Sequence, residues 1–256
     1  MRLKPGYKQT GIGIIPKNWR VKRIRSVASC TAGGTPSTLN PEYWNGNIPW
    51  MSSGELHHKQ INEVEGAITK NGLLNSSAKI IPAGCVLVGL AGQGRTRGTV
   101  AMNLIPLCTN QSIAAILPNP DFVVSEYLYH NLDSRYIELR EISSGGGGRG
   151  GLNLTIISSI NIPLPSIQEQ RTIATVLNDT DALLNALHRL IAKKHNLKRA
   201  FMQQLLTGKT RLPGFEGIWK KKVLKELLIY ERPDRYIVKI PSYSGLGEIP
   251  VLTANK

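Results

Sequence analysis

Apolar positions recur with the period of an α-helix along one unbroken stretch of the chain, between Pro165 and Gly208. No Pro or Gly falls between these two residues. Ser166 followed by Glu169 matches a capping box at the helix start, and Gly208 suits the left-handed turn that closes a helix. The pattern predicts one long helix over residues 166–208, a rod of about 60 Å.

A stripe of apolar side chains runs along this predicted helix at heptad positions a and d, and it is widened at position e. Thr180, Lys194 and Gln204 interrupt it; polar residues there weaken a coiled coil but help to fix its register. Since long helices persist by packing an apolar face, we expect a partner to cover the stripe. The alternative is an unusually long core helix of one globular domain. The positions predicted to pack are Ile173, Val176, Leu183, Leu187, Leu190, Leu197 and Phe201, flanked by Leu177, Leu184, Ile191 and Leu205.

The region before this helix reads mainly as short strands joined by turns. Residues 86–90, 99–102 and 112–117 are apolar and carry β-branched side chains between Gly- and Pro-rich segments. One helix is predicted from Ser125 to Leu139, because apolar residues share one of its faces. It leads to a glycine tract that we expect to be a mobile loop. The predicted class is α+β, a mixed, mainly β domain followed by the long helix.

A motif near the N-terminus returns about two hundred residues later. Trp19 ends the sequence GIIPKNW and Trp219 ends GFEGIW, and apolar residues follow each Trp five and eight positions later. A second matching pair lies at residues 48–52 and 249–253. The repeat predicts three parts: a complete module over residues 1–165, the long helix over 166–208 and the truncated start of a second module over 209–256.

The formal net charge of +15 is distributed unevenly over the 256 residues. Residues 1–30 hold eight Lys or Arg and no acid, residues 31–165 hold eight bases and nine acids, and residues 166–256 hold sixteen bases and eight acids. A hydrophobic content of 41% is typical of a globular protein. The basic excess favours a polyanionic partner, most commonly nucleic acid, over merely solvated faces.

Neither a membrane span nor a disulfide framework is indicated. No apolar run approaches the roughly twenty residues that cross a bilayer, and residues 1–19 lack the apolar core of a signal peptide, so we expect a cytoplasmic protein. The three cysteines, Cys30, Cys85 and Cys108, are scattered and odd in number. They are predicted to be reduced, buried thiols without a metal.

Two short motifs fall one residue short of catalytic signatures. Residues 89–96 carry Arg95 where a phosphate-binding P-loop has Lys, and the chain after Gly98 reads as a strand rather than as a helix. We therefore predict a turn between two strands. Residues 119–122, NPDF, lack the second proline of the motif with which amino-group DNA methyltransferases hold a base, so a turn is favoured there too. The adjacent histidines 57–58 have no neighbours at metal-ligand spacing and are expected on the surface.

Several further motifs stand in a fixed order along the chain. They are GIIPKNW at 13–19, GGTPS at 33–37, YWNGNIPW at 43–50, NQSIAA at 110–115, PLPSIQEQR at 163–171 and LLTGK at 205–209. In this order they resemble the specificity subunit of Type I restriction-modification systems. The set is far more specific than any single motif.

The resemblance implies a DNA-reading subunit without catalytic activity. Members of this family carry two recognition domains separated by long helices that pack as an antiparallel coiled coil, and modification subunits dock on those helices. Adenine methylation with S-adenosylmethionine, and translocation and cleavage with ATP and Mg, would belong to the modification and restriction subunits, so no cofactor is expected on this chain. About forty residues follow Trp219, which makes this chain like a half-sized subunit.

With one recognition domain per chain, we predict a homodimer whose long helices cover one another. Its two recognition domains would read the half-sites of a bipartite, roughly palindromic double-stranded DNA sequence. Lys and Arg would neutralise phosphates, while side chains from glycine-rich segments would read base edges in the major groove. The predicted base-reading residues are Gln93, Arg95, Arg97 and Arg149.

Three other interpretations stay open from sequence alone. The first is a structural adaptor or regulator that uses the long helix and does not read DNA. The second is a self-sufficient enzyme, a P-loop NTPase or a methyltransferase, which binding of a nucleotide or methyl donor would reveal. The third is an inactive remnant of a longer gene.

Overall fold

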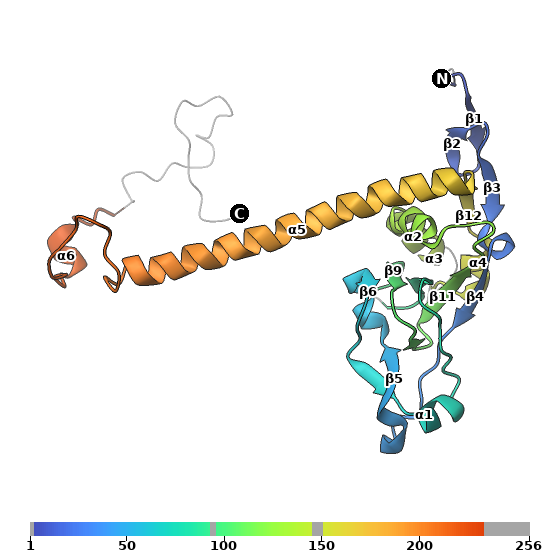
Figure 1. Ribbon diagram of the computed structural model, residues 1–256, viewed down its shortest axis with the longest axis horizontal. Coiled ribbons are helices and arrows are strands. Elements are labelled where there is room, and N and C mark those ends of the chain that lie inside the picture. The colour runs from blue at the N-terminus through green and yellow to red at the C-terminus, as the bar shows by residue number, and fades with distance from the viewer. Residues whose placement is uncertain (1–2, 93–95, 145–150, 233–256) are drawn as a thin grey trace. The chain divides into compact units, whose positions relative to one another are not determined.

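The computed structural model describes residues 3–92, 96–144 and 151–232 (Figure 1). The chain divides into two compact units, Met1–His188 and Arg189–Lys256. In the first unit a mixed β domain is followed by the start of the long helix α5, as the predicted α+β class requires. Among the described residues, no helix combines the length and the apolarity that crossing a membrane requires.

A five-stranded sheet forms the centre of the first unit. Adjacent strands are antiparallel except β9 and β6, which run parallel. The three strands predicted from their apolar runs are the middle of this sheet, and every residue of β8 and β9 is buried because both faces are covered. The strands, in spatial order, are β4 (Ala28–Ala32), β11 (Ile113–Pro118), β8 (Val86–Gly89), β9 (Val100–Asn103) and β6 (Gln60–Ile61).

Alternate residues of the central strands enter two different hydrophobic clusters, because successive side chains of a strand point to opposite faces. Val86 and Val88 pack in a cluster that includes Leu128 of α2 (Ser125–Asp133) and residues of α4 (Leu154–Ser159). Leu87 packs in a second cluster with Leu56. The sheet is therefore the common wall of two cores, and this holds its loops on a rigid base.

Three smaller sheets surround the centre. Sequence periodicity did not predict them, because their strands are short and mostly half-exposed. The short helix α1 (Lys70–Leu74) lies beside one of them. The sheets are the hairpin of β1 (Tyr7–Thr10) and β2 (Gly13–Pro16), the pair of β3 (Arg20–Arg23) and β12 (Asn161–Leu164), and the triplet of β10 (Cys108–Thr109), β5 (Trp44–Met51) and β7 (Gly66–Ile68).

The single helix predicted from Ser125 to Leu139 is wrong: two helices stand there, α2 and α3 (Tyr136–Ser144). The break falls at Ser134, whose hydroxyl donates to the Asn131 carbonyl at 2.9 Å. Such local side-chain bonds compete with the regular helical ladder. The next residue, Arg135, donates its N–H to Leu132 in a tighter three-residue turn, which ends α2.

The long helix is present as α5 (Ile167–Leu205), a continuous element of 39 residues. The Ser166 hydroxyl accepts from the Glu169 N–H at 3.3 Å, as predicted for the helix start, while the Glu169 carboxylate accepts from the Trp19 indole at 3.1 Å. At the other end Gly208 has the predicted left-handed conformation, with φ +73°. Helix start and stop were therefore readable from the capping residues.

A buried glutamine fixes the start of α5 against α2, and Figure 1 shows these two helices side by side. Gln170 is fully buried, and its Oε1 accepts from the Val124 N–H at 2.9 Å. Its Nε2 donates to the carbonyl oxygens of Phe122 and Pro165, both at 3.1 Å. Three backbone groups thus depend on one side chain.

Candidate nucleic-acid interface

The turn between β8 and β9 carries three of the four predicted base-reading residues. Its stem is closed by two backbone bonds of 2.9 Å, from the Gly89 N–H to the Thr99 carbonyl and from the Gly98 N–H to the Gly89 carbonyl. A Cβ on Gly89 would lie 2.2 Å from the Thr96 carbonyl, so only glycine fits there. Because β9 follows the turn, the predicted strand–turn–strand is confirmed, and the helix that a P-loop needs is absent from this described segment.

The chain that follows the glycine tract returns to this same stem. Leu152 donates its N–H to the Leu90 carbonyl at 3.1 Å, while the Leu90 N–H donates to the Ser112 carbonyl at 2.8 Å. The Cα of Gly151 is close as well, since a Cβ there would lie 3.8 Å from the Leu90 carbonyl. The described ends of the two glycine-rich segments singled out from the sequence therefore meet at Leu90, directly after β8.

Of the four predicted base-reading residues, the structure describes one. Gln93, Arg95 and Arg149 lie outside the described residues, and so do residues 145–150 of the tract predicted to be mobile. Arg97 is described; it is half-buried, and its Nε atom is buried. The structure thus brings together the points from which the two segments depart.

Helix α3 supports the stem, and sequence reasoning missed its part in the site. Gly98 has φ +78°, and a Cβ there would lie 3.2 Å from Arg140 Cγ and 3.5 Å from the Tyr136 carbonyl. Arg140 Nη1 donates to the Tyr136 hydroxyl at 2.9 Å, and its guanidinium carbon lies 5.6 Å from the centre of that ring. The sequence signal was an aromatic and a basic residue four positions apart, which share one face of a helix.

The remaining catalytic candidates form ordinary structure. The Asn119 side chain accepts from the Asp121 N–H at 3.0 Å, so the NPDF segment is the predicted turn. His57 and His58 are exposed, and their rings lie 3.9 Å apart between centres, tilted by 39°, at the end of a 3₁₀ helix. Within the described ranges, no group of three His, Cys, Asp or Glu is placed to hold a metal ion.

The cysteines are inert thiols in this environment. Cys85 and Cys108 are buried as predicted, whereas Cys30 is only partly buried. Burial raises the pKa of each of the three thiols to about 11. They therefore stay protonated near neutral pH, and a protonated thiol is a poor nucleophile.

The predicted packing stripe of α5 is largely exposed. Ile173 is the exception, since it packs against the core cluster that contains Ala174. The side chains of the other six predicted positions are between 46% and 60% exposed. These six are Val176, Leu183, Leu187, Leu190, Leu197 and Phe201.

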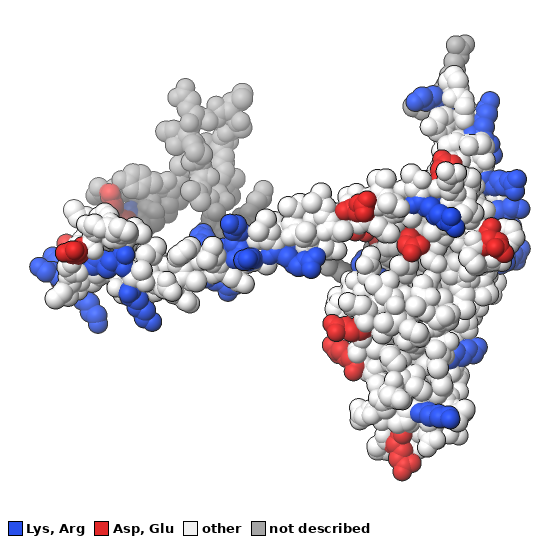
Figure 2. All heavy atoms as spheres, in the orientation of Figure 1, with Lys and Arg blue, Asp and Glu red and all other residues white. Residues whose placement is uncertain are grey.

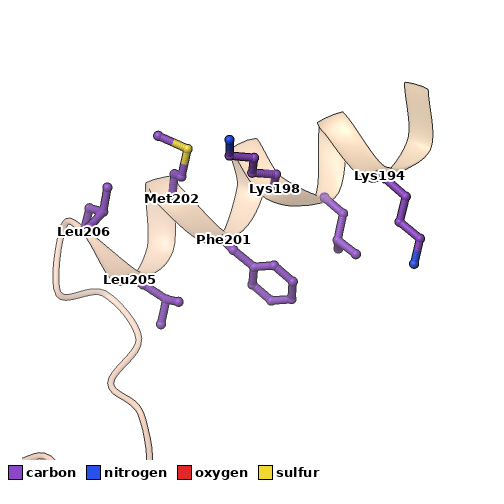
Figure 3. A pocket seen from close by; sticks show the side chains of 7 residues that line it. Lys194, Lys198, Phe201, Met202, Leu205 and Leu206 are labelled. Carbon is purple, nitrogen blue, oxygen red and sulfur yellow. The ribbon is translucent and has the colours of Figure 1, made fainter. Parts of the chain in front are cut away.

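The last turns of α5 are apolar on two sides. Figure 3 shows Phe201 and Leu205 on one side of the helix, and Met202 and Leu206 on the other. Together with Leu197 and two lysines they line a shallow hollow of about 420 Å³. An exposed surface of this kind on a helix is typical of a face that packs against another protein.

The two copies of the sequence repeat share a local conformation but differ in burial. Five residues after Trp19 a short 3₁₀ helix begins at Ile24, and five after Trp219 the short helix α6 (Leu224–Leu227) begins. The residue before each has nearly the same torsions, φ −76° with ψ 146° and φ −79° with ψ 145°. Ile24 is fully buried, whereas Leu224 is 72% exposed.

Comparison with known proteins places this geometry in a family. Residues 16–199 match the family described as the Type I restriction modification DNA specificity domain. The chain is 38% identical over 188 residues to the Type I restriction enzyme MjaIX specificity subunit of Methanocaldococcus jannaschii, covering 72% of this chain and 42% of that protein. It is 29% identical over 181 residues to the EcoR124I/EcoR124II specificity subunit of Escherichia coli, covering 70% and 45%. The chain thus spans slightly less than half the length of these curated relatives.

Solved structures show the same fold. The HsdS subunit from Thermoanaerobacter tengcongensis superposes with a TM-score of 0.54 at 20% identity, covering 78% of this chain and 47% of that one. A chain from a structure of Type I R-M complex assembly and conformational transition gives a TM-score of 0.58 at 20% identity, covering 77% and 48%. These matches support the arrangement of a mixed β domain followed by a long helix.

Proposed function

Because the chain belongs to the Type I restriction-modification DNA specificity family, we propose that it is the non-catalytic subunit that reads one half-site of a double-stranded DNA target. It would direct adenine methylation and DNA cleavage by partner modification and restriction subunits, which would hold the cofactors. The observation that carries the proposal is the junction of Leu90 and Leu152, at which the described ends of two Gly- and Arg-containing segments meet beside the central sheet.

Base reading is assigned to the side chains on these two segments. Gln93, Arg95 and Arg97 would come from the β8–β9 turn and Arg149 from the glycine tract. Arg pairs its two-pronged guanidinium with guanine and Gln pairs its amide with adenine, and each such pair is worth about 1–3 kcal/mol of discrimination. Glycines on both segments leave room for the backbone to approach the groove.

The exposed stripe of α5 is assigned to a second copy of the chain. Two antiparallel helices would cover each other's stripes and form a coiled coil, and the two recognition domains would then bind two related half-sites. Fully burying a large apolar side chain contributes about 1.5–3 kcal/mol, and each of the six half-exposed positions per helix would contribute part of this, which favours association.

Charge on α5 supports the antiparallel orientation. All three acids of the helix, Glu169, Asp179 and Asp181, precede residue 182, whereas five of its six bases lie between Arg189 and Arg199. A parallel pair would place five bases beside five bases. An antiparallel pair places the acidic part of one helix beside the basic part of the other, which removes that repulsion.

A selection experiment tests DNA reading directly. The purified chain, alone and with a modification subunit, is incubated with a library of randomised duplexes, and the bound duplexes are sequenced. Enrichment of one bipartite sequence with inverted halves and a fixed spacer supports the proposal.

The adaptor function is the second candidate, and the exposed α5 stripe favours it equally. An adaptor would bind the modification subunit while enriching no duplex sequence in the same selection. That outcome would replace DNA reading with a role in assembly alone.

A further inference from the structure

The strands at the N-terminus expose a set of basic side chains and carry no acid themselves, while Glu169 of α5 contacts Trp19 between them. Residues 1–30 contain eight Lys or Arg and no Asp or Glu. Figure 2 shows Lys and Arg atoms along the β1–β2 hairpin and β3. We call the six exposed side chains the basic ribbon: Lys4, Lys17, Arg20, Lys22, Arg23 and Arg25.

The basic ribbon is held in place by its own folding contacts. Lys8 Nζ donates to the Lys17 carbonyl at 2.9 Å and to the Trp19 carbonyl at 2.6 Å, which ties the hairpin to β3. β3 pairs with β12 over four residues. Ile24, the residue after β3, is fully buried, and its N–H donates to the Ile160 carbonyl at 2.9 Å. The basic side chains are therefore carried by hydrogen-bonded strands and not by an unpaired terminal segment.

The rest of the recognition module does not share this charge. Residues 31–165 contain eight bases and nine acids, so almost all the positive excess of the module comes from its first 30 residues. Fixed charge of one sign concentrates counter-ions of the other sign at the surface that carries it. The ligand expected there is a polyanion.

We propose that the basic ribbon binds the phosphate backbone of duplex DNA beside the sequence that the loops read, without regard to base sequence. This proposal rests on the proposed function. Lys and Arg that neutralise phosphates supply position and affinity, while base edges supply specificity. A protein partner is less suited to this surface, because the cores of protein interfaces are depleted in charged residues and are more apolar, whereas all six side chains of the ribbon are charged.

The test removes two charges and keeps a polar, unbranched side chain at each position. Arg20→Gln with Lys22→Gln changes two exposed positions of β3 whose backbone pairing to β12 is unaffected. Lys70→Gln with Lys79→Gln is the matched control, because both are exposed residues of the neutral part of the module. Binding is measured by fluorescence anisotropy at several salt concentrations, with a duplex from the selection and a scrambled duplex of equal length.

We expect the β3 variant to bind both duplexes more weakly by the same factor. The slope of log K against log salt is negative, and each lost phosphate contact reduces its magnitude by about 0.9. Losing two contacts therefore reduces the magnitude by about two. The ratio of affinities for the two duplexes stays constant. The control variant keeps the slope of the unmodified chain, and exchanging Arg20→Lys with Lys22→Arg keeps it as well, because the charge is unchanged.

Three results would overturn the proposal: an unchanged slope in the β3 variant, a loss confined to the selected duplex, or lost binding of a modification subunit with unchanged DNA binding. If circular dichroism shows that the β3 variant is unfolded, Lys17→Gln with Arg25→Gln takes its place, since both residues lie outside β3. Failure of the proposed function looks different. In that case the selection enriches no sequence. Scrambled duplex is still bound, and the β3 variant still reduces the magnitude of the slope of log K against log salt.

Discussion

Leu152 donates its backbone N–H to the carbonyl of Leu90 at 3.1 Å, and this bond joins two glycine-rich segments that are far apart in the sequence. Leu90 follows β8 in the middle of the central sheet, and its own N–H is bonded to Ser112. The described ends of both segments are therefore fixed to the same rigid sheet. Contacts with DNA that must hold a fixed register need such a base.

Replacing Arg95 by Ala tests the reading role of the β8–β9 turn. We expect affinity for the selected duplex to fall by about 1–3 kcal/mol, because a paired contact to guanine is lost, while affinity for scrambled duplex changes little. Competition binding with both duplexes measures the difference. An equal loss on both would make Arg95 a phosphate contact and would leave base reading to other residues.

Gly89→Ala tests the close crossing at the stem of that turn. The new methyl would lie 2.2 Å from the Thr96 carbonyl, so the backbone must move, and we expect a loss of at least about 2 kcal/mol in the free energy of unfolding. Urea denaturation measures it. Gly11→Ala is the matched control, because nothing lies within 4 Å of a Cβ there, and its effect should stay near 0.5 kcal/mol or less. Equal stability of the two variants would contradict the close approach of the Thr96 carbonyl to Gly89.

Gln170→Leu tests the anchor between α5 and the recognition module. The change leaves the Val124 N–H and the Phe122 and Pro165 carbonyls without the side chain that bonds them. A buried polar group that loses its partner costs about 1–3 kcal/mol, so we expect a loss of at least about 2 kcal/mol in unfolding free energy. Gln168→Leu, at an exposed position two residues earlier in the same helix, should be nearly neutral. A neutral Gln170→Leu would show that water replaces these bonds.

Two charges on the α5 stripe should separate the proposed homodimer. Leu187→Glu with Leu190→Glu places four carboxylates in the packed seam, and burying unpaired charge is unfavourable. We expect light scattering to show a monomer for this variant at micromolar concentration and a dimer for the unmodified chain. His188→Glu with Gln203→Glu adds the same charge at exposed positions off the stripe and should leave the dimer intact. A monomer before any substitution would contradict the proposal itself.

Much of the fold was readable because strong local signals coincided with burial. Apart from Thr99 and Ser112, which begin two of them, the runs at residues 86–90, 99–102 and 112–117 are apolar, as expected for strands that are covered on both faces. α5 was marked at Ser166 and Gly208 by capping residues whose geometry is set locally. These features depend on few distant contacts.

What sequence reasoning missed depends on contacts between distant residues. Apolar periodicity continues through Ser134, but the Arg135 N–H bonds to the Leu132 carbonyl in a tighter turn, and α2 ends there. Glu169 was predicted to act within its own helix turn, yet its carboxylate is bonded by Trp19, from the other end of the module. Likewise, no local pattern announces that Leu90 and Leu152 are neighbours. The candidate residues of the site could be named, but their convergence could not.

Mapping methylated adenines tests the central claim, that this chain selects the DNA sequence on which its partners act. DNA is sequenced for modified bases from cells that express a modification subunit with this chain, with its Arg95→Ala variant, or without it. The account predicts methylation within one bipartite sequence in the presence of the unmodified chain, reduced by the variant and absent without the chain. Methylation at the same sites when the chain is missing would contradict it.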